Sequence, residues 1–540
     1  MSAVSTPDGA TKAPPRAPRR TGAAATLVAL GILASRLLGL VRQSLTARFL
    51  GGEGSFAADA FMSAFKIPNI LQNMFGEGAL SASFIPVYAN LLEEDPKEAG
   101  HVAGAVLAML ALAVSVLVLM GVLLAPYLIL VIAPGFTGER RELTIRLTRI
   151  LFPGAGIFVL SAWCLGILNS HRKFFLSYAA PVLWNVAMIA ALIGFGKHES
   201  QAALAVRLAW ASVAGAGLQF LVQLPTVVRL VPSLRIGFDR ANAHVRTVMR
   251  NFVPAFVSRG VVQISGYIDQ WLSSFLPVGM PALMGYAQSV YVLPVSLFGM
   301  AVSAAKLPEM SSATGAEAER HTYLRGELDS GLRQIAFFVI PSAAAFLLLG
   351  DVIAAVLFQY GRFGRASTLF SWGILAGSAI GLLAGTLARL YSSTYYALRD
   401  TRTPLRFALV RVVLTTVLGY LFALPLPRAL GIDPRWGAAG LTASAGVAGW
   451  VEFSLLRSRL NARIGVTGLA KRYVASLWIS ALLAGAAAYG VKLLVGMTAP
   501  HVILGGTVLG AFCVVYAVAT FASGVPEARA VINRVRRLLP

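Results

Sequence analysis

Charged residues, cysteine and the spacings of catalytic motifs are all scarce in this chain of 540 residues. Only 13% of the residues are charged, and the two cysteines, Cys164 and Cys513, lie far apart within apolar runs. Two such thiols form neither a disulfide framework nor a metal site. The six histidines are scattered, and no HExxH, CxxC or paired-carboxylate spacing occurs. The sequence therefore predicts no catalytic centre, no cofactor and no enzyme activity.

Apolar residues are abundant instead. They make up 57% of the chain, the mean hydropathy is +0.72, and the apolar runs repeatedly exceed the roughly 20 residues that span a bilayer. We predict an all-α polytopic membrane protein with about 14 transmembrane helices. The net charge of +23 is carried between the apolar runs, which is typical of cytoplasmic loops that face acidic lipid headgroups. We therefore do not expect a nucleic-acid partner.

The distribution of basic residues predicts the topology. The loops after even-numbered spans are rich in Arg and Lys, as is the C-terminal tail, so these parts should face the cytoplasm. Arg140, Arg141 and Arg146 are exceptions, because this topology places them outside. Residues 1-22, rich in Pro, Ala and Arg, are predicted to form a disordered basic tail. Both termini are then cytoplasmic.

An internal repeat divides the chain. Phe75-Gly76, Ser81-Ala82 and Pro86 in the second span return as Phe298-Gly299, Ser303-Ala304 and Pro308 in the eighth, and the segments 168-173 and 398-404 echo each other at the same offset of six spans. Parallel six-span units predict two lobes around a central cavity. We place the first lobe at 23-230 and the second at 231-460. A helix pair at 461-522 and a basic tail at 523-540 complete the chain.

Charged residues inside the spans indicate transport. An ionisable side chain in hydrocarbon costs at least ~2.5–3.5 kcal/mol, so it usually faces water or a polar partner. At ~100° per residue, Asp59, Lys66, Asn73 and Glu77 fall within about 40° of one another and should form one polar stripe down the second span. The first two spans also carry an excess of cations, which favours an anionic ligand. The alternative is that these ions pair with neighbouring helices and hold the bundle together.

The second lobe has fewer charges. Arg259 and Asp269 interrupt the seventh span but lie ~15 Å apart along a helix, so each needs another partner. Arg411 in the eleventh span is one possible partner for Asp269. The glycines of segment 437-449 are predicted to allow close helix packing rather than ligand contact.

Six motifs follow one another along nearly the whole chain: Ser35-Arg-Leu-Leu-Gly-Leu-Val-Arg42, Asp59-Ala-Phe, Phe65-Lys-Ile-Pro-Asn69, Phe75-Gly-Glu-Gly-Ala79, Ala133-Pro-Gly-Phe136 and Leu357-Phe-Gln-Tyr-Gly-Arg-Phe363. In sequence and in order they resemble the motifs of the MurJ (MviN) lipid II flippase family. The resemblance implies the MATE-like fold of the MOP superfamily, with two six-helix lobes and two C-terminal helices that form a lipid-facing groove. It also implies outward flipping of lipid II, the undecaprenyl-pyrophosphate-linked disaccharide pentapeptide, for peptidoglycan synthesis.

The resemblance also implies roles for single residues. Residues matching family positions that line the cavity or its entrance are Arg36, Arg42, Asp59, Lys66, Asn69 and Glu77. We expect Arg36, Arg42, Lys66 and Asn69 to bind the diphosphate or head group, and Asp59, Glu77 and Asp269 to act in gating or coupling.

The chain also departs from the family pattern. Gln72 and Ser289 stand where the family has basic residues, and we expect Arg259 to substitute for one of them. Asp269 matches a sodium ligand of some members and is a weak candidate for a metal ligand. Its expected partners, Thr415 and Gly419, are poor cation ligands.

The preferred interpretation is therefore a lipid II flippase of the bacterial inner membrane that works by alternating access. Lipid II and the phospholipid bilayer are its expected partners, together with proteins of cell-wall synthesis. One alternative is another lipid-linked oligosaccharide flippase or a MATE-like antiporter. Another is a transport-inactive scaffold for envelope assembly. The sequence leaves membrane potential, sodium and protons open as the driving force.

Overall fold

The computed structural model describes residues 21–239, 241–312, 316–496 and 500–536, so the predicted tail at 1-22 lies almost wholly outside the described residues. Within these ranges the chain forms helices and no β-strand. Eleven of the helices are long and apolar enough to cross a membrane. The prediction of an all-α polytopic membrane protein is confirmed, while the count of 14 spans stays a prediction.

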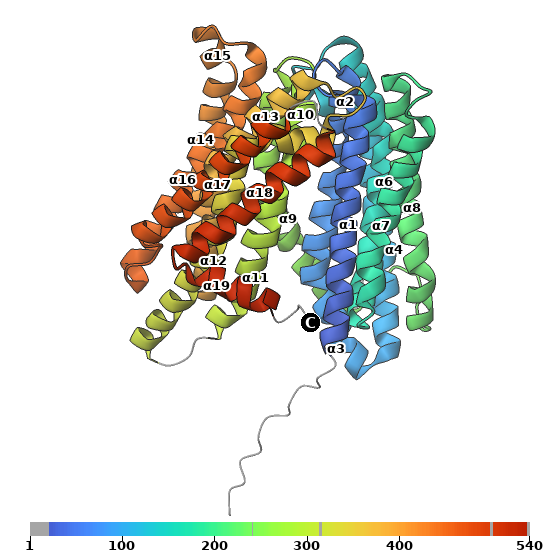
Figure 1. Cartoon of the computed structure of the whole chain (residues 1–540). Helices are drawn as coiled ribbons and strands as arrows, with labels where there is room; N and C mark the ends of the chain where they lie inside the picture. The colour runs from blue at the N-terminus through green and yellow to red at the C-terminus, as the bar shows by residue number, and fades with distance from the viewer. Residues whose placement is uncertain (1–20, 240, 313–315, 497–499, 537–540) are drawn as a thin grey trace, which may run out of the picture.

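The first half of the chain forms what we call the N-terminal group, blue to green in Figure 1. Its elements are α1 (Thr21–Leu50), α2 (Phe56–Leu71), η1 (Gln72–Leu80), α3 (Ser81–Glu94), α4 (Pro96–Leu123), α5 (Ala125–Ile132), α6 (Gly138–Ser170), α7 (Phe174–Phe195) and α8 (Gln201–Leu230). Helix α6 lies at the centre of this group, where it packs against α2, α4 and α8.

The second half forms the C-terminal group, which stands beside the first in Figure 1. Its elements are α9 (Ala243–Ser274), α10 (Met280–Pro294), η2 (Val295–Met300), α11 (Ala301–Ser311), α12 (Glu317–Phe358), α13 (Arg365–Ala397), α14 (Arg402–Ala423), α15 (Pro425–Ala429), η3 (Pro434–Trp436) and α16 (Gly437–Ile464). Helices α17 (Lys471–Val495) and α18 (His501–Ala522) pack on each other and on α12, and α19 (Pro526–Arg536) follows them.

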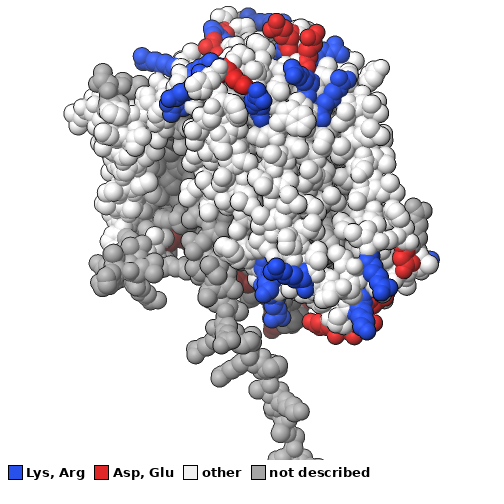
Figure 2. Space-filling view, turned by 90° about the vertical axis from the view of Figure 1, so that its right-hand side faces the viewer, with Lys and Arg blue, Asp and Glu red and all other residues white. Residues whose placement is uncertain are grey.

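Charged side chains avoid the middle of the bundle surface. Figure 2 shows one face on which Lys, Arg, Asp and Glu gather at the two ends, with an uncharged band between them. Exposed apolar side chains cover the lipid-accessible helices, including Leu119 and Leu123 of α4 and Val514 and Val518 of α18. Such a band is what a bilayer requires of a protein that spans it, because uncompensated charges are costly in hydrocarbon.

The first sequence echo corresponds to a shared break in helical geometry. Phe75-Gly76 lies in η1 and Phe298-Gly299 lies in η2, and both elements are π-helical stretches within longer helices. Each stretch is followed at once by an α-helix that contains the repeated Ser-Ala pair and the repeated proline. Long π-helical stretches are rare and often mark functional sites. Their recurrence at matching places gives the sequence repeat a structural counterpart.

The second echo corresponds to a shared helix cap. Arg172 after α6 has φ 57° and Arg399 after α13 has φ 59°, and both are left-handed without being glycine. In each case the next residue closes the helix: Lys173 N donates to Leu168 O, and Asp400 N donates to Tyr395 O. This bond pattern is that of a Schellman cap. The fourth and tenth predicted spans therefore end in the same way.

Glycines hold α13 and α16 in close contact. A Cβ on Gly381 would lie 2.4 Å from Cα of Gly446, so the two backbones touch. Gly437 and Gly440 approach the carbonyl oxygens of Ala423 and Phe422 at the end of α14 as closely. The prediction that these glycines serve helix packing is confirmed for Gly437, Gly440 and Gly446.

Candidate functional site

Two arginines of α1 point toward neutral hydrogen-bond acceptors. Arg36 donates to Ser296 Oγ of η2 at 3.0 Å, which joins the N-terminal group to the C-terminal group. Arg42 donates through Nε to Asn185 Oδ1 at 3.1 Å, and its guanidinium lies 4.7 Å from the ring centroid of Trp184. In the part of the chain that the structure describes, neither arginine has a carboxylate within 4 Å. Among the described residues, their positive charges are therefore held in place but not neutralised.

Lys66 and Asn69 lie one turn apart on α2. Both are half-buried, and the Lys66 carbonyl accepts a hydrogen bond from the Tyr267 hydroxyl of α9 at 3.4 Å. Asn69 lines a small cavity inside the N-terminal group together with Gln72. The Lys66 backbone thus meets α9 of the C-terminal group.

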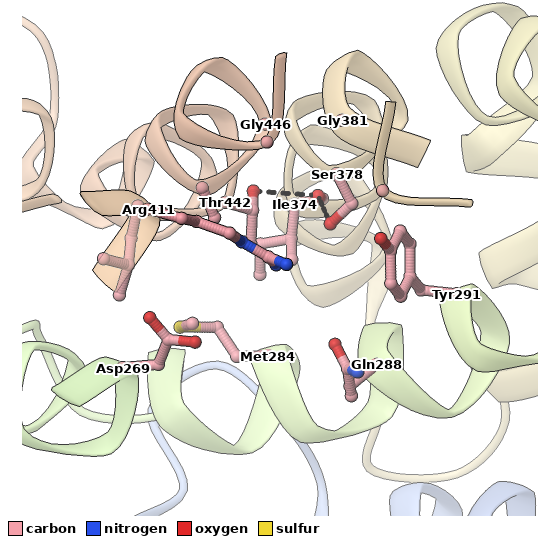
Figure 3. Close-up of a pocket in the computed structure, with 14 residues that line it drawn as sticks. Asp269, Met284, Gln288, Tyr291, Ile374, Ser378, Gly381, Arg411, Thr442 and Gly446 are labelled. Atoms are coloured by element: carbon pink, nitrogen blue, oxygen red, sulfur yellow. Dashed lines mark hydrogen bonds between the residues drawn. The ribbon is translucent and has the colours of Figure 1, made fainter. Parts of the chain in front are cut away.

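A polar cavity of about 180 Å³ lies in the C-terminal group (Figure 3). Asp269, Gln288, Tyr291 and Arg411 line it, and Figure 3 shows the Arg411 guanidinium above Asp269 and Gln288. Arg411 forms its ion pair with Glu452 of α16 at 3.2 Å and not with Asp269, whose Oδ1 has no hydrogen-bond partner among the described residues. The sequence prediction that Arg411 neighbours Asp269 holds for position, but the carboxylate partner of Arg411 is Glu452.

This cavity is poorly suited to a metal ion. The described residues contain no group of three His, Cys, Asp or Glu side chains that could hold one. Thr415 and Gly419 are buried, and a Cβ on Gly419 would lie 2.9 Å from the Leu441 side chain. A permanent guanidinium in the same cavity also repels a second cation.

Asp59 joins three elements at one end of the bundle. Its Oδ2 accepts the Gly279 N–H at 2.7 Å, and its Oδ1 accepts the Ala282 N–H at 2.8 Å, both at the start of α10. Arg140 of α6 lies 2.8 Å from the same carboxylate and 3.6 Å from the ring centroid of Phe136. Asp59 is fully buried. A carboxylate at a helix N-terminus is stabilised by its free N–H groups and by the helix dipole.

The loop between α1 and α2, residues 51–55, adds further bonds at this end. Gly54 N donates to Val278 O at 3.1 Å, and Glu53 pairs with Arg435 at 2.5 Å. Gly279 is required here, because its φ is +96° and a Cβ would lie 2.4 Å from Gly52 O. We call the bonds of Asp59 and of loop 51–55 to the C-terminal group the gate.

A second carboxylate supports Arg435. The Asp433 carboxylate accepts hydrogen bonds from the side chain and from the backbone N–H of Arg435. These hydrogen bonds, together with the charge of the Arg435 guanidinium, hold the pKa of Asp433 below its ordinary value, although burial opposes the shift. Arg435 thus joins two carboxylates, Asp433 on its own loop and Glu53 on the other group. In the gate, Arg435 of the C-terminal group therefore forms an ion pair with Glu53 of the N-terminal group.

The predicted stripe along the second span is not continuous. The helix changes to π geometry at Gln72, so 100° per residue no longer applies beyond Leu71. Asp59 is buried against Arg140 and α10, and it lies on the same unbroken helix as Lys66, seven residues away. The predicted alignment of Asp59 with Lys66 is therefore compatible with α2, whereas its extension to Asn73 and Glu77 fails because it crosses the π-helical stretch.

Other predicted residues are placed as follows. Glu77 lies in η1 and Arg259 in α9, and their side chains are outside those that the structure describes. The Ser289 hydroxyl donates to the Tyr286 carbonyl at 2.6 Å, one turn back on its own helix. Gln72 lines the cavity that Asn69 lines. Neither Gln72 nor Ser289 supplies a positive charge in place of the missing basic residues.

Sequence reasoning missed the partners of the predicted residues. Arg140 completes the Asp59 cluster, Ser296 and Asn185 hold the two α1 arginines, and Arg435 pairs with Glu53. Arg140 did carry a signal, since it broke the positive-inside pattern. The three others had no signal in the sequence, because each contact joins residues more than 140 positions apart.

Comparison with known sequences identifies close relatives. The family model described as lipid II flippase MurJ matches residues 47–504. The lipid II flippase MurJ of Burkholderia cenocepacia is 34% identical over 438 residues, covering 80% of this chain and 82% of the relative. A probable lipid II flippase MurJ of Rhizobium tropici is 31% identical over 471 residues, covering 85% of this chain and 84% of the relative.

Solved structures show the same fold. A lipid II flippase MurJ in an inward closed conformation matches with a TM-score of 0.76 and 23% identity, covering 94% of this chain and all of the other. An inward-facing multidrug resistance MATE transporter of the MOP superfamily matches with a TM-score of 0.62 and 18% identity, covering 81% and 98%. At these identities the likeness establishes the fold alone.

Proposed function

Because this chain belongs to the MurJ family, we propose that it is a lipid II flippase that carries the undecaprenyl-pyrophosphate-linked peptidoglycan precursor from the inner to the outer leaflet of the bacterial inner membrane. It is a transporter and not an enzyme. The observation that carries the proposal is the pair of α1 arginines, which are positioned by neutral partners and have no carboxylate within 4 Å in the described part of the chain.

A diphosphate suits these arginines. Guanidinium groups bind phosphate oxygens through two parallel hydrogen bonds, and charge-assisted bonds of this kind are about twice as strong as neutral ones. The head group of lipid II must leave water to cross the bilayer, and fixed cations replace part of its lost hydration. Arg36, Arg42 and Lys66 supply three positive charges for this purpose, and Asn69 supplies an amide. Arg259 is proposed as a fourth cation, from the second lobe.

The gate supports alternating access. Its bonds join the two groups at the end of the bundle where loop 51–55 lies. The hydrogen bond from Arg36 of α1 to Ser296 of the C-terminal group lies closer to the opposite end of the bundle. We infer that the gate closes the outer side, so the α1 arginines face the cytoplasm in this state. Breaking the gate would let the groups separate at the outer end and expose the head group there.

The positive-inside distribution gives the orientation that this cycle needs. Both termini are placed in the cytoplasm, with residues 23-230 and 231-460 as the two lobes and 461-522 as the pair that guides the lipid tail. Moving one negative charge outward gains ~2.3 kcal/mol per 100 mV of membrane potential, so the potential favours export of a diphosphate. Proteins that consume lipid II at the outer surface are the expected functional partners.

The test is complementation of a bacterium depleted of its own lipid II flippase, with lipid II at the outer leaflet as readout. Wild type should rescue growth, and Arg42→Ala should fail at equal expression because the head group loses a positioned cation. The matched control is Arg207→Ala, which removes an exposed arginine paired with Glu199. Arg259→Ala tests whether that residue replaces the missing family arginines.

Two results would count against the proposal. Failure of a correctly inserted wild type to rescue would favour another lipid-linked oligosaccharide, a MATE-like substrate or a transport-inactive scaffold. Rescue by Arg42→Ala as complete as by wild type would show that the α1 arginines do not bind the substrate.

A further inference from the structure

A second polar cavity lies where α18 meets the C-terminal group, and neither Arg36 nor Arg42 lines it. It measures about 250 Å³ and is lined by Asp351, Val352, Ala355, Gln359, Arg365, Thr368, Leu369, His501 and Leu504. These residues come from the end of α12, the start of α13 and the start of α18. The proposed topology places all three at the outer leaflet.

The charges around this cavity favour an anion. Asp351 is already paired with Lys492 of α17 at 2.5 Å, so its carboxylate is neutralised. Arg365 lines the cavity and has no carboxylate within 4 Å among the described residues. His501 Nδ1 is buried, with no hydrogen-bond partner in that part of the chain. The cavity therefore has one free guanidinium and one unsatisfied imidazole nitrogen.

Two helix N-termini end at the same place. Arg365 is the first residue of α13 and His501 the first of α18, and neither helix has a side-chain cap. Within the described residues their leading N–H groups remain available to an acceptor, and the positive ends of the two helix dipoles lie at the cavity. Backbone donors, a guanidinium and an imidazole together form the donor set that proteins use for phosphate.

The surroundings indicate that the phosphate is carried by a lipid. Leu369 lines the cavity and is 43% exposed, and Val502 and Ile503 next to His501 are 67% and 55% exposed. These apolar side chains extend from the polar cavity along α13 and α18, where acyl chains would lie. A soluble phosphate would gain nothing from them, whereas a phospholipid buries its chains there.

We propose that this cavity binds the phosphate group of an anionic phospholipid of the outer leaflet, with Arg365 and His501 as its side-chain ligands. The lipid bridges α18 to α12 and α13 and so fixes the C-terminal helix pair against the rest of the protein. This site is independent of the transported substrate and of the α1 arginines.

Native mass spectrometry of the detergent-purified protein with added phosphatidylglycerol tests the proposal. Wild type should retain the lipid, and Arg365→Gln should bind it about five-fold more weakly, the factor that corresponds to about 1 kcal/mol per basic residue near a membrane surface. Arg428→Gln is the matched control, because Arg428 is an exposed arginine of α15 that does not line the cavity. It should bind as wild type does.

Three outcomes would overturn the proposal. One is equal retention by Arg365→Gln and wild type, and another is an equal loss in Arg428→Gln. The third is binding of glycerol 3-phosphate, which lacks chains, as tight as that of phosphatidylglycerol. His501→Gln provides a second variant that keeps the helix start and should also weaken retention. Because rescue of growth is not the readout, this test remains informative if the protein transports something other than lipid II.

Discussion

Replacing Asp59 by asparagine removes the negative charge of the gate while it nearly preserves the size of the side chain. The carboxylate accepts hydrogen bonds from Gly279 N and Ala282 N at 2.7 and 2.8 Å, and it forms an ion pair with Arg140 at 2.8 Å. An asparagine offers one acceptor oxygen, and its amide group points N–H toward groups that are themselves donors. At least one of the three bonds is lost, and Arg140 keeps its charge without a partner.

The size of the effect follows from burial. Arg140 is 8% exposed and Asp59 is not exposed, so the unpaired guanidinium stays out of water as long as the gate is closed. Removing one member of a buried pair costs about 3–5 kcal/mol. When the gate opens, water reaches Arg140, so the cost applies chiefly to the closed state. A cost of about 3 kcal/mol shifts the equilibrium toward the open state more than 100-fold.

Cross-linking measures this shift. Arg48 and Arg362 lie on the two sides of the gate, with Arg362 N donating to Arg48 O at 2.9 Å, and both side chains are exposed. Cysteines at these two positions, in a protein with Cys164→Ala and Cys513→Ala, should react with a short bifunctional thiol reagent in membranes. Asp59→Asn should lower the yield strongly. Asp95→Asn is the control, because Asp95 caps α4 through two backbone N–H groups and asparagine caps equally well.

Wild-type cross-linking in an Asp59→Asn protein that elutes as a folded species would refute this reasoning. It would mean that the bonds of Asp59 contribute the same free energy to both states, and that some other contact holds the groups together. A low yield in Asp95→Asn would show instead that the assay reports general loss of structure.

Two further predictions concern the same gate. Gly279→Ala should lower the cross-linking yield, because the new Cβ would lie 2.4 Å from Gly52 O, whereas Gly54→Ala, with φ +77° but no atom within 4 Å of its Cβ, should have a smaller effect. Asp433 has a depressed pKa, so its contribution to the gate is complete above the ordinary aspartate value of about 4 and is lost as the pH falls through the depressed value. Spin labels attached at Arg48→Cys and Arg362→Cys should therefore report a constant distance from pH 7 to 5 and a longer distance at lower pH. In the Asp433→Asn variant this change should be smaller. A change in distance between pH 7 and 5 would contradict the assignment of the effect to Asp433.

Local sequence patterns predicted the architecture well. Both repeat echoes were short segments whose geometry depends on a few neighbouring residues, and each returned in the structure as a shared π-helical stretch or a shared cap. Helix type and membrane burial likewise follow from composition over windows of about 20 residues. These features could be predicted because they require no knowledge of which helices are neighbours.

The site could be predicted only in part, for the opposite reason. Asp59 was identified as a gating or coupling residue, but its acceptor role depends on Gly279 and Ala282, 220 and 223 positions away. The stripe prediction failed because a helical angle summed over 18 residues assumes an unbroken α-helix, and η1 breaks it. Charge in a span marks a functional residue, yet its partner is a tertiary contact that one sequence does not reveal.

The partners divide the intramembrane cations into two sets with different roles. Arg140 forms an ion pair with Asp59, and Arg411 forms one with Glu452. The charges of these two arginines are therefore neutralised within the protein, and the pairs hold helices together. Arg36 and Arg42 are held by a serine hydroxyl and an asparagine amide, which fix position without cancelling charge. A charge kept in a membrane protein without a counter-ion is expensive, so its persistence requires that something else supply the anion for part of the cycle. The diphosphate of a transported lipid would supply it, and this is why substitutions in the first set should move the gate whereas those in the second should abolish transport with the gate intact.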